Sequence, residues 1–181
     1  MSIETKNLTE IPAGELFKIG RFEFIKFADE NGKVTAVSKD SLLDSKFGNN
    51  NDLSKSEVLK KLTDEILPEI EKEVGSENVL EFETDLLSLD GSSKHGVMRS
   101  RIGLPTFDFY RKHRAIFEKH KLDKWWWLAT PDGTSEYNND NWIVCVAPSG
   151  NICDINYFGN DYGVRPFCIL NSDIFVSCEE R

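Results

Sequence analysis

The segment WWWLATPDG occupies residues 125–133, and the segment GVRPF follows it at residues 163–167. Three adjacent tryptophans can form a ligand-stacking platform, a surface for a partner or part of a hydrophobic core. From residue 125 onward the chain reads as apolar runs separated by turn residues: WWWLA, NWIVCVAP, NICDINYF and RPFCIL. Short apolar runs between such turns predict a series of β-strands in this part of the chain.

A hairpin pattern lies near the other end of the chain. RFEFIKF (21–27) alternates polar and apolar residues, and KVTAVSK (33–39) follows the turn residues Asn31 and Gly32. An Asn-Gly pair supplies the two positive φ angles of a tight hairpin turn. We therefore expect a β-hairpin here.

The middle of the chain carries helical patterns. Apolar residues recur at intervals of four from Val58 to Ile70, after a capping-box pattern that begins at Ser54. Pro68 should kink this helix or end its first segment near Leu67, and Gly75 should end the helix.

A second helix is expected over 107–120, with Thr106 as its N-cap. Short antiparallel strands at both ends and two main helices between them predict one α+β domain over residues 1–181, in which 1–17 could form an extended arm.

The segments LPTFDFYRKHRAIF (104–117), WWWLATPDG and GVRPFCIL (163–170) occur in a specific order. This order resembles an uncharacterised family of domains from gut bacteria and their phages, with the signature WWL(R/A)(S/T)P followed by GVRP. The resemblance extends from Leu16 to Val176. It implies a C-type-lectin-like fold, related to the formylglycine-generating enzymes and to variable receptor-binding proteins of phages.

In folds of that kind the aromatic strand lies in the core. The resemblance therefore implies structural roles for Trp125 and Trp127, which would share one side of the strand because side chains alternate. Trp126 would take the other side, and we expect it to face outward. Arg165 would be held within the domain by a carboxylate or by backbone carbonyls.

The formal net charge of −9 argues against non-specific binding of nucleic acid by the protein alone. Residues 57–90 contain eleven acids and three lysines, whereas residues 101–124 contain seven basic and three acidic residues. The acidic segment is either an ordinary solvated face or a surface that occupies a basic region of a partner.

The chain has no apolar run of about 18 residues, so we expect no membrane span. The polar start MSIETKNLTE lacks the pattern of a signal peptide. We therefore expect the protein to work in the cytoplasm of a host cell.

Residues typical of catalysis are few. His113 and His120 fall on the basic helix, where solvated or packing roles are usual, and His95 stands in a loop near Ser92 and Asp90. Nucleophilic catalysis needs a base beside the nucleophile. No GxSxG elbow, P-loop or HExxH motif accompanies these residues.

Four cysteines occur without a CxxC pair: Cys145, Cys153, Cys168 and Cys178. We expect free thiols that behave as small buried hydrophobes, with disulfides or a metal site as the alternatives. Formylglycine-generating enzymes use cysteines that bind copper, and none of the four matches that site. The resemblance therefore does not carry the activity, and we expect no cofactor and no enzyme.

The loops between the C-terminal strands give the best candidate for recognition. Oxygen-bearing side chains between 132 and 141 could coordinate calcium as in lectins, although Asn and Asp are also usual turn residues. The candidate partner-binding residues are Trp126, Tyr137, Trp142, Tyr157 and Tyr162, together with Glu65, Glu69 and Glu73 on the acidic helix.

These features favour a non-catalytic binding module of phage or mobile-element origin. The most specific hypothesis is an acidic, anti-CRISPR-like inhibitor that occupies the basic surface of a host defence nuclease. A lectin-like domain that binds a receptor or a carbohydrate is the second hypothesis. An oxidase or hydrolase on the same fold is the third.

Overall fold

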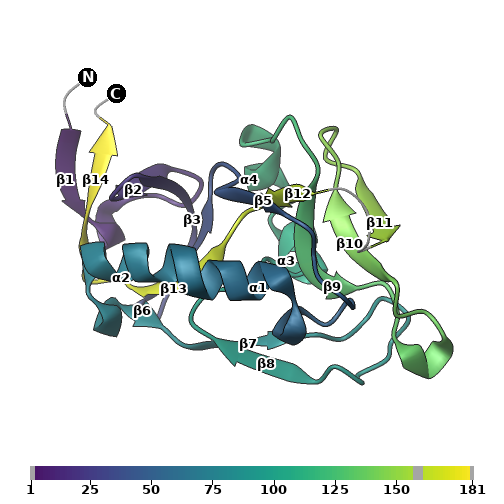
Figure 1. Ribbon diagram of the computed structural model, residues 1–181. Helices are drawn as coiled ribbons and strands as arrows, with labels where there is room; N and C mark the ends of the chain where they lie inside the picture. Colours follow the sequence, from purple (N-terminus) through teal and green to yellow (C-terminus); the bar gives the residue numbers. More distant parts are fainter. Residues whose placement is uncertain (1–2, 157–160, 180–181) are drawn as a thin grey trace.

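The computed structural model describes residues 3–156 and 161–179, and Figure 1 shows the arrangement of the chain. The protein has a mixed α/β fold in which most strands pair antiparallel. The largest sheet has seven strands in the order β1-β14-β2-β3-β4-β13-β6. Its strands are β1 (Ile3–Asn7), β2 (Leu16–Ile19), β3 (Phe22–Glu30), β4 (Lys33–Ser38), β6 (Val79–Leu80), β13 (Phe167–Asn171) and β14 (Phe175–Glu179).

A second sheet has five strands in the order β11-β10-β9-β12-β5, and β7 and β8 form a separate two-stranded sheet. These strands are β5 (Leu43–Ser45), β7 (Phe82–Asp85), β8 (Val97–Ser100), β9 (Trp126–Pro131), β10 (Trp142–Val146), β11 (Ile152–Asn156) and β12 (Tyr162–Val164). Among the pairings of named strands, only that of β12 with β9 is parallel.

The predicted hairpin is confirmed by β3 and β4. Asn31 and Gly32 connect them with φ angles of 54° and 76°, as a tight turn requires. The prediction that Gly75 ends the first helix is also confirmed, since this residue has a φ of 87° and caps the helix through its N–H.

The expectation of two main helices is wrong. The first helical region consists of α1 (Glu57–Lys61), a π-helical turn η3 (Leu62–Ile66) and α2 (Leu67–Val74). Pro68 lies in the first turn of α2 and has no N–H, and the π-helical turn directly before it accommodates the changed hydrogen bonding. Ser56, and not Ser54, is the N-cap of α1, because its hydroxyl accepts a hydrogen bond from the Leu59 N–H.

The second helical region is divided as well. It forms α3 (Phe107–Lys112) and α4 (Arg114–Lys119), which are separated at His113, whose backbone angles of −108° and 23° are not helical. Thr106 is the N-cap of α3, as predicted. Four short 3-10 segments complete the described structure: η1 (Leu8–Glu10), η2 (Leu53–Lys55), η4 (Ser76–Asn78) and η5 (Ser135–Tyr137).

Trp126 and Trp127 lie on β9, the central strand of the five-stranded sheet, and this strand is buried on both faces. Trp127 belongs to the larger hydrophobic cluster and Trp125 packs against it, whereas Trp126 belongs to a second cluster with Tyr110 and Phe117. The expectation that Trp126 faces outward is therefore wrong, since only 2% of this residue is exposed. Helices α3 and α4 cover that face of the sheet, which a single strand pattern cannot reveal.

Arg165 is buried behind Trp126. Its Nε donates to the Ser38 carbonyl oxygen at 2.9 Å and its Nη1 donates to that of His120 at 3.4 Å. The guanidinium carbon also lies 4.9 Å from the centre of the Trp126 ring. Burial lowers the pKa of Arg165 to about 10. Arg165, which lies between β12 and β13, thus contacts the end of β4, the residue after α4 and the first residue of β9 through one side chain.

The two ends of the described chain lie together, because β1 pairs with β14 in the register Ile3 to Glu179 (Figure 1). The loops around η5 lie at the opposite end of the molecule. Within residues 3–156 and 161–179, no helix is both long enough and apolar enough to cross a membrane.

Candidate functional site

Three loops meet at the end of the molecule far from the termini (Figure 1). They comprise residues 46–56 after β5, 86–96 between β7 and β8, and 132–141 between β9 and β10. Backbone hydrogen bonds join the second to the third, since Leu89 N donates to Pro131 O at 3.0 Å and Asp90 N donates to Asp132 O at 3.1 Å. We call these loops, together with the first residues of β8 and β10, the loop platform.

Asn51 connects the first loop to the third. It is fully buried, and its Nδ2 donates to the Gly133 carbonyl oxygen at 2.8 Å and to the Trp142 carbonyl oxygen at 2.9 Å. A buried amide that makes several hydrogen bonds fixes the position of the backbone it contacts. The start of β10 is therefore held in a defined place by a residue from a distant part of the sequence.

A second buried contact joins the other two loops through hydroxyl groups. Thr134 Oγ1 lies 2.7 Å from Ser92 Oγ, and Ser92 Oγ donates to Glu136 Oε2 at 2.6 Å. Lys94 Nζ also donates to the Ser135 hydroxyl. These bonds give the exposed loops an ordered framework beneath their surface.

His95 lies inside this framework and not at its surface. Its Nε2 is 2.9 Å from Asn51 Oδ1 and its Nδ1 is 3.9 Å from Asp52 Oδ2. Burial lowers the pKa of His95, although the Asp52 carboxylate opposes this shift. Burial alone would raise the pKa of Asp52, but hydrogen bonds from Lys55 and Ser54 outweigh it and hold that pKa below its usual range. His95 therefore serves as a neutral structural contact near pH 7.

Most of the large exposed hydrophobic side chains lie on the loop platform. Among the described residues, six large hydrophobic side chains are exposed, and five belong to the platform: Leu87, Leu89, Val97, Tyr137 and Trp142. Their exposed fractions range from 39% for Trp142 to 59% for Tyr137. The sixth, Phe175, lies on β14 near the termini. Exposed apolar groups gathered in one region commonly mark a protein interaction site.

Acidic residues accompany these apolar groups. Asp85, Asp90 and Glu136 are exposed on or beside the same loops, and Lys94 is the exposed basic residue of the second loop. The hydrogen bonds of the Asp90 carboxylate to Ser88 and to backbone N–H groups hold its pKa below the usual range. The platform therefore presents apolar side chains together with negative charge.

The candidate residues predicted from the sequence fall in different places. Tyr137 and Trp142 are exposed on the platform, but Trp126 is buried. Tyr162 is half-buried, with its ring centre 4.6 Å from that of Trp127, so it belongs to the edge of the core. Tyr157 lies outside the described residues.

The acidic helix residues also differ from one another. Glu65 and Glu73 are exposed, and neither has an ion-pair partner among the described residues. Glu69 is paired with Arg21 through two hydrogen bonds of 2.7 and 2.8 Å. The bidentate pair neutralises the central carboxylate of the three, so only two of these three acids are free of an ion pair within the described residues.

Sequence reasoning missed Asn51, Leu87 and Leu89. The segment LLSLD (86–90) contains a signal for the two leucines. Leu87 and Leu89 point toward solvent, whereas the polar Ser88 between them points inward, which is the reverse of the usual pattern of buried apolar and exposed polar residues. Apolar side chains on the solvent side of a strand-like segment indicate an interaction surface. The role of Asn51 had no such signal, because GNNND reads as an ordinary loop.

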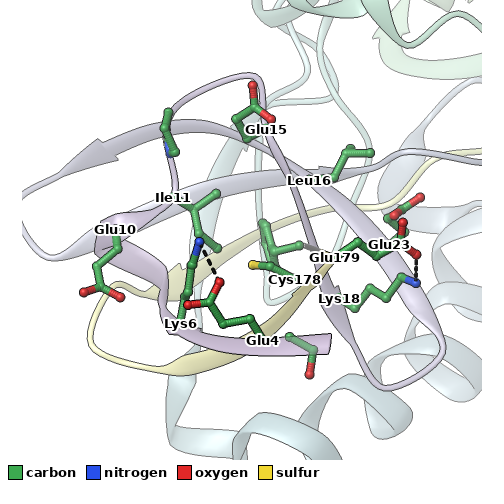
Figure 2. A pocket seen from close by; sticks show the side chains of 13 residues that line it. Glu4, Lys6, Glu10, Ile11, Glu15, Leu16, Lys18, Glu23, Cys178 and Glu179 are labelled. Carbon is green, nitrogen blue, oxygen red and sulfur yellow. Dashed lines mark hydrogen bonds and ion pairs between the residues drawn. The ribbon is translucent and has the colours of Figure 1, made fainter. Parts of the chain in front are cut away.

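An open groove of about 850 Å³ lies at the other end of the molecule, against β1, β2 and β14 (Figure 2). Its walls carry many charged side chains, but most of the carboxylates are already engaged. Glu4 pairs with Lys6 at 3.0 Å, and Glu179 pairs with Lys18 at 2.6 Å. Glu10 accepts a hydrogen bond from the Asn7 N–H as part of a helix cap. These pairings make the groove a weaker candidate than the loop platform.

The asparagine and aspartate side chains of the third loop are used locally. Asn139 Nδ2 donates to Asp132 Oδ2 at 2.7 Å. Within the part of the chain that the structure describes, no group of three or more His, Cys, Asp or Glu residues is placed to hold a metal ion. All four cysteines are free thiols; Cys145, Cys168 and Cys178 are buried, whereas Cys153 is half-buried.

Comparison with known proteins gives one result. No curated protein and no solved structure matches the chain. One family of domains matches residues 40–172, which is more than half of the chain. The protein therefore belongs to the family described as a domain of unknown function, DUF6273.

Proposed function

We propose that the protein is a non-catalytic binding module that recognises a partner protein through the loop platform. The observation that carries this proposal is the gathering of five exposed apolar side chains on three loops that are joined by buried hydrogen bonds. Trp and Tyr contribute strongly to binding at protein interfaces, and both occur here as Trp142 and Tyr137. A rigid framework lowers the entropy cost of presenting them.

The charge of the platform suggests the nature of the partner. Exposed Asp85, Asp90 and Glu136 favour a basic surface with an apolar centre, because complementary charges increase the association rate and select the partner. The net charge of −9 extends this preference to the whole molecule. A narrower form of the proposal is an anti-CRISPR-like inhibitor of a host defence nuclease, since such nucleases contain basic nucleic-acid channels. The free carboxylates of Glu65 and Glu73 support it.

The extent of the family match favours the platform over the groove. The matched residues 40–172 include all three platform loops. All residues that line the groove lie outside this segment, between 4 and 23 or between 177 and 179. A function shared across the family is therefore better assigned to the platform.

A C-type-lectin-like fold and a lectin-like role are the second proposal. The order of the segments around WWWLATPDG and GVRPF and the mostly antiparallel sheets support it. Tyr137 and Trp142 could stack on a sugar ring as well as on a protein side chain. An enzymatic role has the least support. Burial raises the pKa of the Cys145 and Cys168 thiols to about 12, and such thiols are poor nucleophiles.

The test compares variants of the tagged protein in capture from bacterial lysate. The platform variant carries Tyr137→Ser and Trp142→Ser, and the control carries Phe175→Ser, which removes an exposed aromatic group of the opposite end. We expect proteins captured by the wild type and the control to be lost with the platform variant. Equal capture by all three proteins contradicts the platform proposal.

The salt dependence of the same capture tests the narrower proposal. A basic nuclease that is retained at low salt and released at high salt supports an acidic inhibitor, because salt screens exposed charges. Glu65→Gln with Glu73→Gln should then weaken capture, whereas Lys72→Gln on the same helix should not. Retention on polysaccharide without a captured protein would instead support the lectin-like role.

A further inference from the structure

Cys145 and Cys153 face each other across the hairpin of β10 and β11. On the other side of Cys145, the register partner on β9 is Trp127. Directly opposite residues of neighbouring strands project from the same face of a sheet. Cys145 is part of the larger hydrophobic cluster and Cys153 packs against that cluster, so both thiols lie on the same side.

The hairpin turn determines how far apart the two cysteines are. Ala147 N donates to Asn151 O at 2.9 Å, and hydrogen-bonded and non-hydrogen-bonded pairs alternate along an antiparallel ladder. Two positions further, Cys145 and Cys153 therefore form a hydrogen-bonded pair, in which the Cα atoms lie about 5.5 Å apart. Disulfides bridge Cα separations of about 4.4–6.8 Å.

The strand that carries Cys153 has room to adjust. Facing Cβ atoms in a ladder are about 4.5–5.5 Å apart, whereas the mean in a disulfide is about 3.8 Å. β11 is the edge strand of its sheet and pairs only with β10 in that sheet. A shift of about 1 Å toward β10 therefore breaks no second ladder.

The two thiols differ in their access to solvent. Cys145 is fully buried, and burial raises its pKa to about 12. Cys153 is only half-buried on the edge strand. An oxidant therefore reaches Cys153 first. The remaining cysteines have no thiol opposite them, since Cys168 faces Ala36 and Cys178 faces Glu4.

We propose that Cys145 and Cys153 are a reversible redox pair that hydroperoxides close to a cross-strand disulfide. The Cys153 thiolate attacks one peroxide oxygen and the O–O bond breaks, which gives a sulfenic acid and, after proton uptake, an alcohol or water. The Cys145 thiol, which need not ionise beforehand, then passes its proton to the departing hydroxyl as its sulfur bonds to the sulfenic sulfur, so the S–S bond forms and water is released. Two thiols lose two hydrogens in total and one hydroperoxide is reduced.

The closed pair should be easy to reduce. A disulfide at a hydrogen-bonded ladder position must draw the two strands together, and strained disulfides are more reducible. Thiols such as dithiothreitol should therefore reopen it without unfolding the protein. This reversibility distinguishes a redox pair from a permanent structural link.

The experiment uses the full chain and hydrogen peroxide. After oxidation, free thiols are blocked with N-ethylmaleimide in denaturant, and the protein is cut before aspartates. The resulting peptide 140–153 contains Cys145 and Cys153 and neither of the other cysteines. We expect this peptide to carry no maleimide and to be lighter than the reduced, unblocked peptide by two hydrogens. When dithiothreitol is added before the blocking step, we expect both of its cysteines to carry maleimide.

Variants identify the order of the steps. Cys145→Ser should leave a sulfenic acid on Cys153 that dimedone traps, and Cys153→Ser should leave Cys145 available for blocking after denaturation. Cys178→Ser is the matched control, which should behave as the wild type because it leaves the pair intact. Two maleimides on peptide 140–153 after peroxide treatment of the wild type would overturn the proposal. So would oxidation that links either thiol to another molecule, and this result does not depend on the folding of any variant.

Discussion

The Oδ1 atom of Asn51 and the Nε2 atom of His95 lie 2.9 Å apart, so one hydrogen bond links the first loop of the platform to the second. The amide nitrogen of the same asparagine donates to Gly133 and Trp142 at the two ends of the third loop. A single buried side chain therefore connects all three loops. It holds in place the backbone of the tryptophan to which we assign recognition.

Replacing Asn51 should destabilise the protein and loosen the platform. Asn51→Ala leaves two carbonyl groups and His95 without their buried partner. The free energy of unfolding should fall by about 1–3 kcal/mol, the usual cost of unsatisfied buried polar groups. Urea unfolding measures this change. Asn141→Ala, at an exposed position of the third loop, should alter stability by less than about 0.5 kcal/mol. Equal effects of the two substitutions would contradict the role of Asn51.

Acid should weaken the protein through His95. Burial places the pKa of His95 in the folded protein below the ordinary histidine value of about 6.5. Well above pH 6.5 the imidazole is neutral in both states and its contribution to stability is complete. As the pH falls below this value, the unfolded chain binds a proton that the folded chain does not, so the free energy of unfolding decreases.

This dependence can be measured by urea unfolding at several pH values between 7.5 and 5. His95→Gln should reduce the slope of stability against pH in this window, where one proton accounts for at most about 1.4 kcal/mol per pH unit. His113, whose pKa is also lowered by burial, should supply part of the remaining slope. A variant as pH-dependent as the wild type would show that His95 is not the responsible group.

The parts of the fold that could be predicted from the sequence depend on local chemistry. The turn at Asn31 and Gly32, the cap at Thr106 and the helix end at Gly75 each follow from the residues themselves. The burial of Trp126 could not be predicted in this way. It requires α3 and α4 to lie on the sheet, and this depends on contacts with Tyr110 and Phe117.

The candidate site shows the same limit. Tyr137 and Trp142 could be selected as exposed aromatic residues of a loop. However, the site also needs Asn51 and Leu89, which are far away in the sequence and meet that loop only after folding. The pairing of Glu69 could not be predicted for a related reason, because its partner Arg21 comes from a distant turn.

Replacement of a buried tryptophan and of an exposed one should have different effects on the free energy of unfolding. Trp127 is fully buried and its Nε1 donates to the Ser45 carbonyl oxygen at 2.8 Å. Trp127→Ala should therefore lower the free energy of unfolding by about 3–5 kcal/mol, as expected for a large buried aromatic residue. Trp142→Ala should change it by less than about 0.5 kcal/mol. Thermal or urea unfolding measures both, and a large loss for Trp142→Ala would assign that residue to the core.

Arg165 should not tolerate lysine. Its guanidinium donates to Ser38 and His120 and lies over the Trp126 ring, and no carboxylate of residues 3–156 or 161–179 forms an ion pair with it. A lysine ammonium cannot reproduce this geometry, and its charge is more costly to bury. Arg165→Lys should therefore lower the free energy of unfolding by about 1–3 kcal/mol in urea. The same substitution at exposed Arg99 is the matched control, because its ion pair with Glu83 is solvated and contributes little. If both variants unfolded at the same urea concentration, the carbonyl contacts of Arg165 would contribute no more than a surface charge.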